Sequence, residues 1–70
     1  DNPARLREVI GALFTLGEIY MRAERMTEAC ATLAESRGGY QRLEKEFTLS
    51  DFDRETGLER VEALMKDCPA

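Results

Sequence analysis

The amino-acid sequence predicts an all-α fold, an antiparallel helical hairpin with a third helix packed back on it. Apolar residues recur at helical spacing in three stretches, a helix-capping residue stands before each stretch, and no stretch alternates with the period of two that marks a strand. Hydrophobic residues make up 43% of the chain, which argues against disorder. A chain of 70 residues forms one domain, residues 1–70, with a modest core.

The first helix is predicted over residues 3–23. Asn2 is a favourable N-cap, and Pro3 loses no hydrogen bond at the first helical position. Its apolar side is wider than one neighbouring helix can cover, so this helix needs two packing surfaces, inside the domain or outside it. The apolar arc comprises Leu6, Val9, Ile10, Leu13, Leu16, Gly17 and Tyr20, widened by Ala12, Phe14, Ile19 and Met21.

The second helix is predicted over residues 27–46. The polar break at residues 23–26 is too short for anything but an antiparallel return, and Thr27 is the expected N-cap. Two glycines at residues 38–39 each cost about 1 kcal/mol in a helix interior, but the apolar stripe keeps its phase across them, so one continuous helix is expected. That stripe comprises Ala29, Leu33, Ser36, Tyr40, Leu43 and Phe47.

The third helix is predicted over residues 50–67. Ser50 is the expected N-cap, two aspartates follow in the first turn, and Pro69 ends the helix. Phe52 lies off the apolar stripe and is expected to pack over the connection between the second and third helices. The stripe itself comprises Leu58, Val61, Leu64, Met65 and Cys68.

The predicted hairpin carries a sparse pattern made of Leu13, Leu16-Gly17, Tyr20, Ala29, Leu33 and Ser36. This pattern resembles the tetratricopeptide repeat, in which small residues let two helices cross closely. Gly17 and Ala29 are therefore expected at the crossing, with Tyr20 and Leu33 filling the space beside it. The chain departs from the repeat where Leu13 stands in place of the usual Trp, and where the closing Pro is absent.

A second likeness is carried by Ala29-Cys30, Ser36, Tyr40, Leu43, the run from Leu49 to Asp53, Val61, Leu64 and Cys68-Pro69. These residues resemble the tails that close a row of tetratricopeptide repeats behind a sensor or protein-kinase domain in certain bacterial proteins. The resemblance implies that the third helix caps the last repeat and that upstream repeats cover the first helix. The chain begins without an initiator Met and is expected to be a piece of a longer bacterial signalling protein.

The resemblance also implies a function, which is protein–protein interaction. In such repeats the first helix lines a concave groove that holds a partner protein or peptide. The positions carried over to that role are Arg5, Glu8, Thr15, Glu18 and Arg22. An ordinary solvated helix face explains the same polar residues equally well.

A homo-oligomerisation domain is the alternative function. In this case the apolar arc of the first helix, centred near Leu13, meets a second copy of the chain across a two-fold axis. The residues expected at the edge of that contact are Ile10, Phe14 and Met21.

Cys30 and Cys68 are predicted to lie at the same end of the molecule. The second helix leads away from Cys30 over nearly the same number of residues as the third helix takes to return to Cys68. A disulfide is therefore geometrically possible. Two buried free thiols are the other interpretation, and it suits a cytoplasmic protein.

Several classes of function lack support in the sequence. The chain has no His, its carboxylates lack the spacing of a hydrolase or a metal site, and no cofactor motif is present, so no catalytic, cofactor or metal site is predicted. A formal charge of −4 disfavours nucleic-acid binding. No apolar stretch approaches a membrane span and no signal peptide is visible, so a cytoplasmic location is expected.

Overall fold

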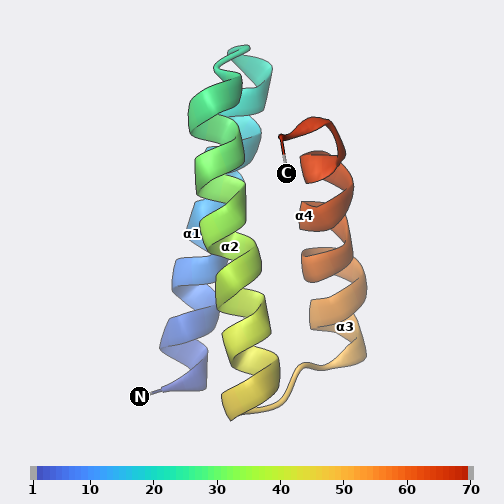
Figure 1. Ribbon diagram of the computed structural model, residues 1–70. Coiled ribbons are helices and arrows are strands. Elements are labelled where there is room, and N and C mark those ends of the chain that lie inside the picture. Colours follow the sequence, from blue (N-terminus) through green and yellow to red (C-terminus); the bar gives the residue numbers. More distant parts are fainter. Residues whose placement is uncertain (1, 70) are drawn as a thin grey trace.

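The computed structural model describes residues 2–69 as two long antiparallel helices with a third helix beside them (Figure 1). The described residues contain no strand, which confirms the predicted all-α hairpin with a packed-back helix. The third helix is continuous but contains one π-helical turn and a final 3-10 turn. The elements are α1 (Pro3–Arg22), α2 (Met26–Glu46), and then the third helix, made of α3 (Asp51–Asp53), η1 (Arg54–Leu58), α4 (Glu59–Leu64) and η2 (Met65–Asp67).

Two of the three helix starts have the predicted caps. The Asn2 side chain accepts a hydrogen bond from the Ala4 N–H at 2.9 Å, and Pro3 takes the first helical position. At the start of the third helix, the Ser50 hydroxyl accepts from the Asp53 N–H at 3.0 Å, while the Asp53 carboxylate accepts from the Ser50 N–H at 3.3 Å. This reciprocal capping box satisfies two backbone donors that the helix leaves unpaired.

The predicted N-cap of α2 is wrong. The helix begins at Met26 rather than after Thr27, and its N-cap residue Arg25 makes no side-chain cap hydrogen bond. The reason lies in the preceding turn, where Glu24 adopts a left-handed backbone conformation with φ of 59°. The Arg25 N–H then donates to the Tyr20 carbonyl at 2.9 Å, which closes α1 with a Schellman motif and reverses the chain early.

Two glycines set the spacing between α1 and α2. A Cβ on Gly17 would lie 2.5 Å from Leu33 Cδ2, and a Cβ on Gly39 would lie 2.5 Å from Ile10 Cγ1. Between these points the buried Ser36 hydroxyl donates a hydrogen bond to the Ile10 carbonyl at 3.1 Å. Neither approach leaves room for a larger residue, so the two helices cross as closely as the sequence suggests.

One partner in that crossing differs from the expectation. The side chain nearest to Gly17 is that of Leu33, whereas Ala29 lies one helical turn nearer the connection. A large residue of α2 thus fills the gap left by a glycine of α1, as in ridge-into-groove packing. Helix α2 continues through Gly38 and Gly39, as predicted.

The third helix completes the core by packing on α2. Gly57 lies directly against the ring and hydroxyl of Tyr40, within the π-helical turn η1. Burial, followed by the nearby Asp53 carboxylate, raises the pKa of Tyr40. The buried hydrophobic core comprises Ile10, Phe14, Leu33, Tyr40, Leu43, Leu58 and Val61.

The expectation for Phe52 is wrong. Its side chain is 73% exposed, the most exposed of the large hydrophobic residues described. Phe47 and Leu49 pack against the core beside the connection instead, which leaves Phe52 on the solvent side of α3.

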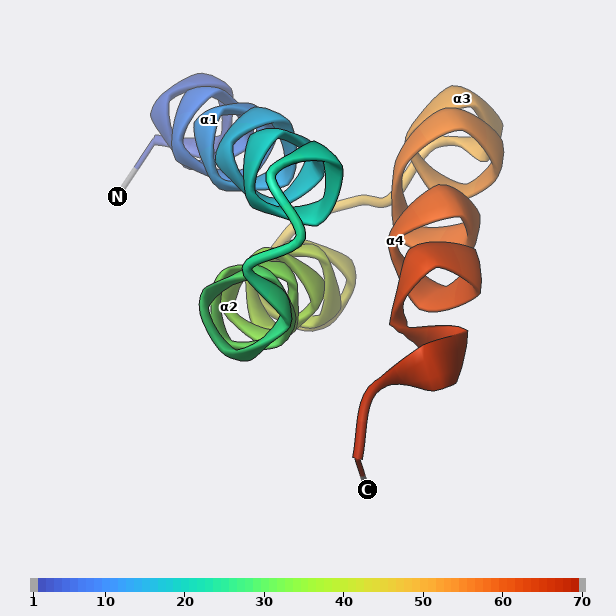
Figure 2. The same ribbon diagram turned by 90° about the horizontal axis from the view of Figure 1, so that it is seen from above.

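The third helix is fastened at both ends. Near the connection, the Arg7 guanidinium donates to the Asp53 carboxylate and to the Thr48 carbonyl, each at 3.2 Å. At the far end a disulfide joins Cys30 and Cys68, whose Cα atoms are 5.8 Å apart. The disulfide interpretation is confirmed and the free-thiol interpretation is wrong. Figure 2 shows the third helix beside the hairpin of α1 and α2, so these links tie the third helix to both hairpin helices.

Candidate interaction surface

The polar residues that the repeat resemblance assigns to a partner are Arg5, Glu8, Thr15, Glu18 and Arg22. Four of them lie along one side of α1, and all but Glu18 are exposed. The Glu18 carboxylate pairs with Arg60 Nη2 of α4 at 3.4 Å, so it is turned toward the third helix. Arg5 lines a groove that none of the other four residues lines. Arg5 and Glu18 thus have surroundings different from those of Glu8, Thr15 and Arg22.

The residues expected at the edge of a two-fold contact are placed differently from the prediction. Ile10 and Phe14 are buried by the chain itself, with exposed fractions of 1% and 7%, and Met21 packs against the core. The arc of α1 is turned so that its Ile10–Gly17 side faces α2, because both residues lie at the close approaches between the helices. Ile10 and Phe14 are therefore wrong as contacts with a second copy.

The opposite edge of the arc is the exposed one. Val9, Leu16 and Ile19 have exposed fractions of 51%, 40% and 49%. They follow one side of α1 at helical spacing, together with exposed Ala12 and partly buried Leu13. We call this surface of Val9, Ala12, Leu13, Leu16 and Ile19 the outer face. As predicted, α1 has more apolar surface than its own chain covers. The exposed residues are Val9, Leu16 and Ile19, however, and not Ile10 and Phe14.

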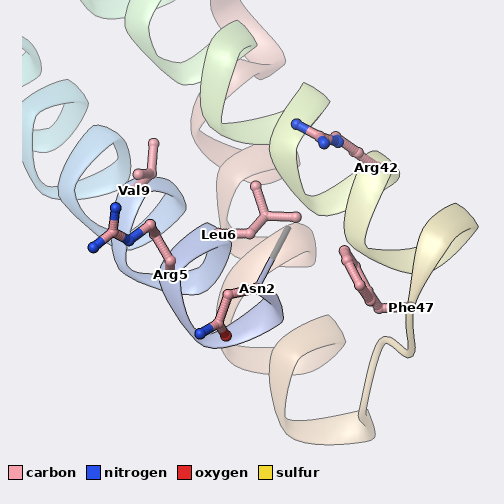
Figure 3. Close-up of a pocket in the computed structure, with 6 residues that line it drawn as sticks. All are labelled: Asn2, Arg5, Leu6, Val9, Arg42 and Phe47. Carbon is pink, nitrogen blue, oxygen red and sulfur yellow. The ribbon is translucent and has the colours of Figure 1, made fainter.

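A groove continues the outer face toward the start of α1. It has a volume of about 670 Å³ and lies between the first half of α1 and the last turns of α2 (Figure 3). In Figure 3 the Arg42 side chain reaches from α2 toward α1, and Leu6 lies between the two helices. Its lining residues are Asn2, Arg5, Leu6, Val9, Arg42 and Phe47.

The groove brings together residues from the start of α1 and the end of α2, which are far apart in the sequence. Arg42 and Phe47 belong to the end of α2, and neither was a candidate site residue. Antiparallel pairing of two helices of similar length places the end of the second beside the start of the first. That signal was present in the sequence, but the side of α2 that faces the groove depends on the rotation set by the glycine contacts.

Two charged groups at the surface have pKa values that are shifted by local hydrogen bonds. The pKa of Glu28 is lowered by hydrogen bonding to its own backbone N–H and by Arg25, and the pKa of Arg54 is raised by its hydrogen bond to Glu44. Both lie at the surface in local ion pairs. Within residues 2–69 no cluster of His, Cys, Asp and Glu could hold a metal ion. None of the helices in this part of the chain combines the length and apolar character needed to cross a membrane.

The outer face and the groove therefore form one continuous surface, which we call the candidate interaction surface. Its centre is apolar and its two arginines stand at one end. No protein-family model, no curated protein and no solved structure matches the chain.

Proposed function

We propose that this protein is a helical protein-interaction module that packs the outer face of α1 against a helix of another protein segment. The observation that carries the proposal is the exposure of Val9, Leu16 and Ile19 on one side of one helix. Contiguous exposed apolar side chains are typical of protein interaction sites. Burial of apolar surface yields about 25 cal/mol per Å², so covering this face gives a favourable free energy of association.

The resemblance to the tetratricopeptide repeat supports a neighbouring helical repeat as the partner. Such repeats bury their apolar faces by stacking on one another. The proposal places the chain at the end of a repeat array in a bacterial signalling protein, without catalytic activity of its own. The net charge of −4 and the apolar character of the face favour a protein over a nucleic acid as partner.

The compartment is a separate part of the proposal. A cytoplasmic location is the expectation from the sequence, but disulfides persist mainly in oxidising compartments. The bond between Cys30 and Cys68 therefore supports an oxidising compartment for this domain.

Protection of a single introduced thiol tests whether the outer face is covered. Both native cysteines are bonded to each other, so Ile19→Cys supplies the one free thiol of the oxidised chain. Maleimide labelling is compared between the purified chain and the protein in an extract of the cells that produce it. We expect labelling of Ile19→Cys to slow at least about tenfold in the extract, because a bound helix excludes the reagent.

Glu62→Cys is the control, since Glu62 is exposed on α4 and lies outside the outer face. It should be labelled at the same rate in both samples. Equal rates for Ile19→Cys in the two samples would show an uncovered face and defeat the proposal.

A homo-oligomer remains the second candidate, now on the outer face instead of Ile10 and Phe14. A second copy would protect Ile19→Cys in the purified chain as its concentration rises. The same protection, seen without any cell extract, separates this candidate from a neighbouring repeat.

A further inference from the structure

We propose that the chain also associates with copies of itself head to tail, with Phe52 of one copy seated in the groove of the next. Two observations that the outer face leaves unexplained carry this inference. One is a groove with an arginine on each helix, and the other is an aromatic ring that is 73% exposed between carboxylates. Neither feature needs a neighbouring repeat, so the inference goes beyond the proposed function.

The groove has an apolar floor and basic edges. Leu6, Val9 and Phe47 supply apolar surface, while Arg5 comes from α1 and Arg42 from α2 (Figure 3). The Arg42 Nε lies 2.7 Å from the Glu46 carboxylate, which helps to hold the side chain in position. Arg5 makes no ion pair among residues 2–69, so its charge is available to an incoming carboxylate.

Phe52 has the complementary character. It lies in the first turn of the third helix, next to Asp51 and one turn from Glu55, and both acidic side chains are exposed. Residues 51–67 contain six acidic and three basic residues, so the third helix has an acidic surface. A ring flanked by two carboxylates about one helical turn apart matches an apolar floor flanked by two guanidinium groups.

The occupant must come from a second copy. No residue of the third helix lines the groove. Arg5, which lines the groove, and Arg7, which pairs with Asp53 of α3, are two residues apart and so lie on nearly opposite sides of α1. The third helix packs on α2 instead, where Gly57 lies against the ring of Tyr40. Because the donor ring and the acceptor groove are different surfaces, the contact is heterologous, and it adds copies in a row without closing a symmetric pair.

The contact is small, so association should be weak and dependent on salt. One ring and two ion pairs bury much less than the ~800 Å² per partner of a stable interface. The exposed ion pairs are screened by salt, with a Debye length of about 8 Å at physiological ionic strength. The average mass should therefore rise with protein concentration between about 10 μM and about 1 mM, and fall back when salt is added.

Two variants that each remove one half of the contact test the inference. Phe52→Ser removes the ring and leaves the groove, whereas Arg5→Glu reverses the charge of the groove and leaves the ring. Both residues are exposed, so neither change should disturb folding, which circular dichroism verifies. Sedimentation equilibrium is measured for the wild type, for each variant alone and for an equal mixture of the two.

Each variant alone should stay monomeric at about 1 mM, while the mixture should form a one-to-one heterodimer that grows no further. The ring of the Arg5→Glu chain then occupies the groove of the Phe52→Ser chain. A wild type that remains monomeric, a Phe52→Ser chain that associates like the wild type, or a mixture without heterodimers would each overturn the inference.

Ile19→Glu separates this contact from the outer face. It should keep the head-to-tail association, because Ile19 does not line the groove. Loss of self-association in Ile19→Glu combined with its retention in Phe52→Ser would instead assign the contact to the outer face. Failure of the head-to-tail test leaves the labelling test of the proposed function unaffected, since that test follows Ile19 alone.

Discussion

At the residue scale, adjacent glycines of α2 occupy opposite environments. Gly38 faces open space, with nothing within 4 Å of a Cβ placed on it, whereas a Cβ on Gly39 would lie 2.5 Å from Ile10 Cγ1. Ile10 is 1% exposed, and side chains in a protein interior are closely packed. One glycine is thus required by packing, and its neighbour is merely tolerated.

Alanine substitutions should therefore have opposite effects on the free energy of unfolding. Gly38→Ala should raise it by about 0.5–1 kcal/mol, because alanine loses less backbone entropy in a helix. Gly39→Ala should lower it by about 1–3 kcal/mol through overpacking against Ile10. Urea unfolding followed by circular dichroism measures both values.

Gly11→Ala is the matched control on α1, since it also faces open space within a helix. It should stabilise the chain by about the same amount as Gly38→Ala. If Gly39→Ala also proved stabilising, the close approach of α1 and α2 would not be needed for packing, contrary to the structure.

At the element scale, the third helix depends on its two end attachments. The Cys30–Cys68 disulfide spans 38 residues of sequence and joins the first turns of α2 to the end of the third helix. Closing a loop of this length stabilises a native state by about 4 kcal/mol in the chain-entropy model. A 70-residue chain has a small core, so this link is a large part of its stability.

Replacing both Cys30 and Cys68 by serine should lower the free energy of unfolding by about 2–4 kcal/mol. The wild type with excess dithiol reductant should unfold at the same urea concentration as the variant. Hydrogen exchange should quicken most in α4 and η2, which the bond secures. An unchanged midpoint in both experiments would mean that the disulfide is dispensable.

The element starts show what the sequence could and could not predict. The N-cap roles of Asn2 and Ser50 were predicted correctly, because a cap depends on residues within one turn of it. The N-cap role predicted for Thr27 was wrong, because the left-handed conformation of Glu24 moved the start of α2. Such a conformation is rare for a residue with a side chain, so nothing in the sequence indicated it.

At the scale of the whole molecule, Arg7 and Asp53 connect the first helix to the third. Burial raises the pKa of the Asp53 carboxyl. Hydrogen bonds with Ser50 and the Arg7 guanidinium lower it by more than burial raises it, so the net pKa lies below the ordinary value of 3.8. When folding lowers the pKa of a carboxyl group, the native state is stabilised at every pH above the pKa of that group in the unfolded chain. The stabilisation is lost as the pH falls through the pKa of the group in the folded protein.

Asp53→Asn should therefore be less stable than the wild type at pH 7, and the difference should shrink between about pH 5 and pH 2. Thermal unfolding followed at several pH values measures this difference. Arg7→Gln should reduce the same acid-dependent part, because it removes one of the groups that lower the pKa of Asp53. A difference between Asp53→Asn and the wild type that stays constant with pH would contradict this assignment.

The fold as a whole was predictable, whereas the candidate surface was only partly so. Helical periodicity gave three helices and their order, and the matched lengths of the last two brought Cys30 and Cys68 together. The excess apolar surface of α1 was also foreseen. Its exposed edge was not, because the rotation of α1 is fixed by contacts of Gly17 and Gly39 with residues far away in sequence.

The π-helical turn at Arg54–Leu58 has a consequence for changes in chain length. A π turn holds one residue more than an α turn, and it is equivalent to a single inserted residue inside an otherwise regular helix. Deleting one residue here would restore the regular helix but rotate Phe52 and Asp53 by about 100° relative to Val61. The ring and the partner of Arg7 would then change direction while the buried half of the helix kept its place. The single extra residue of the π turn thus sets the angle between the buried side of this helix at Val61 and the side that carries Phe52 and Asp53.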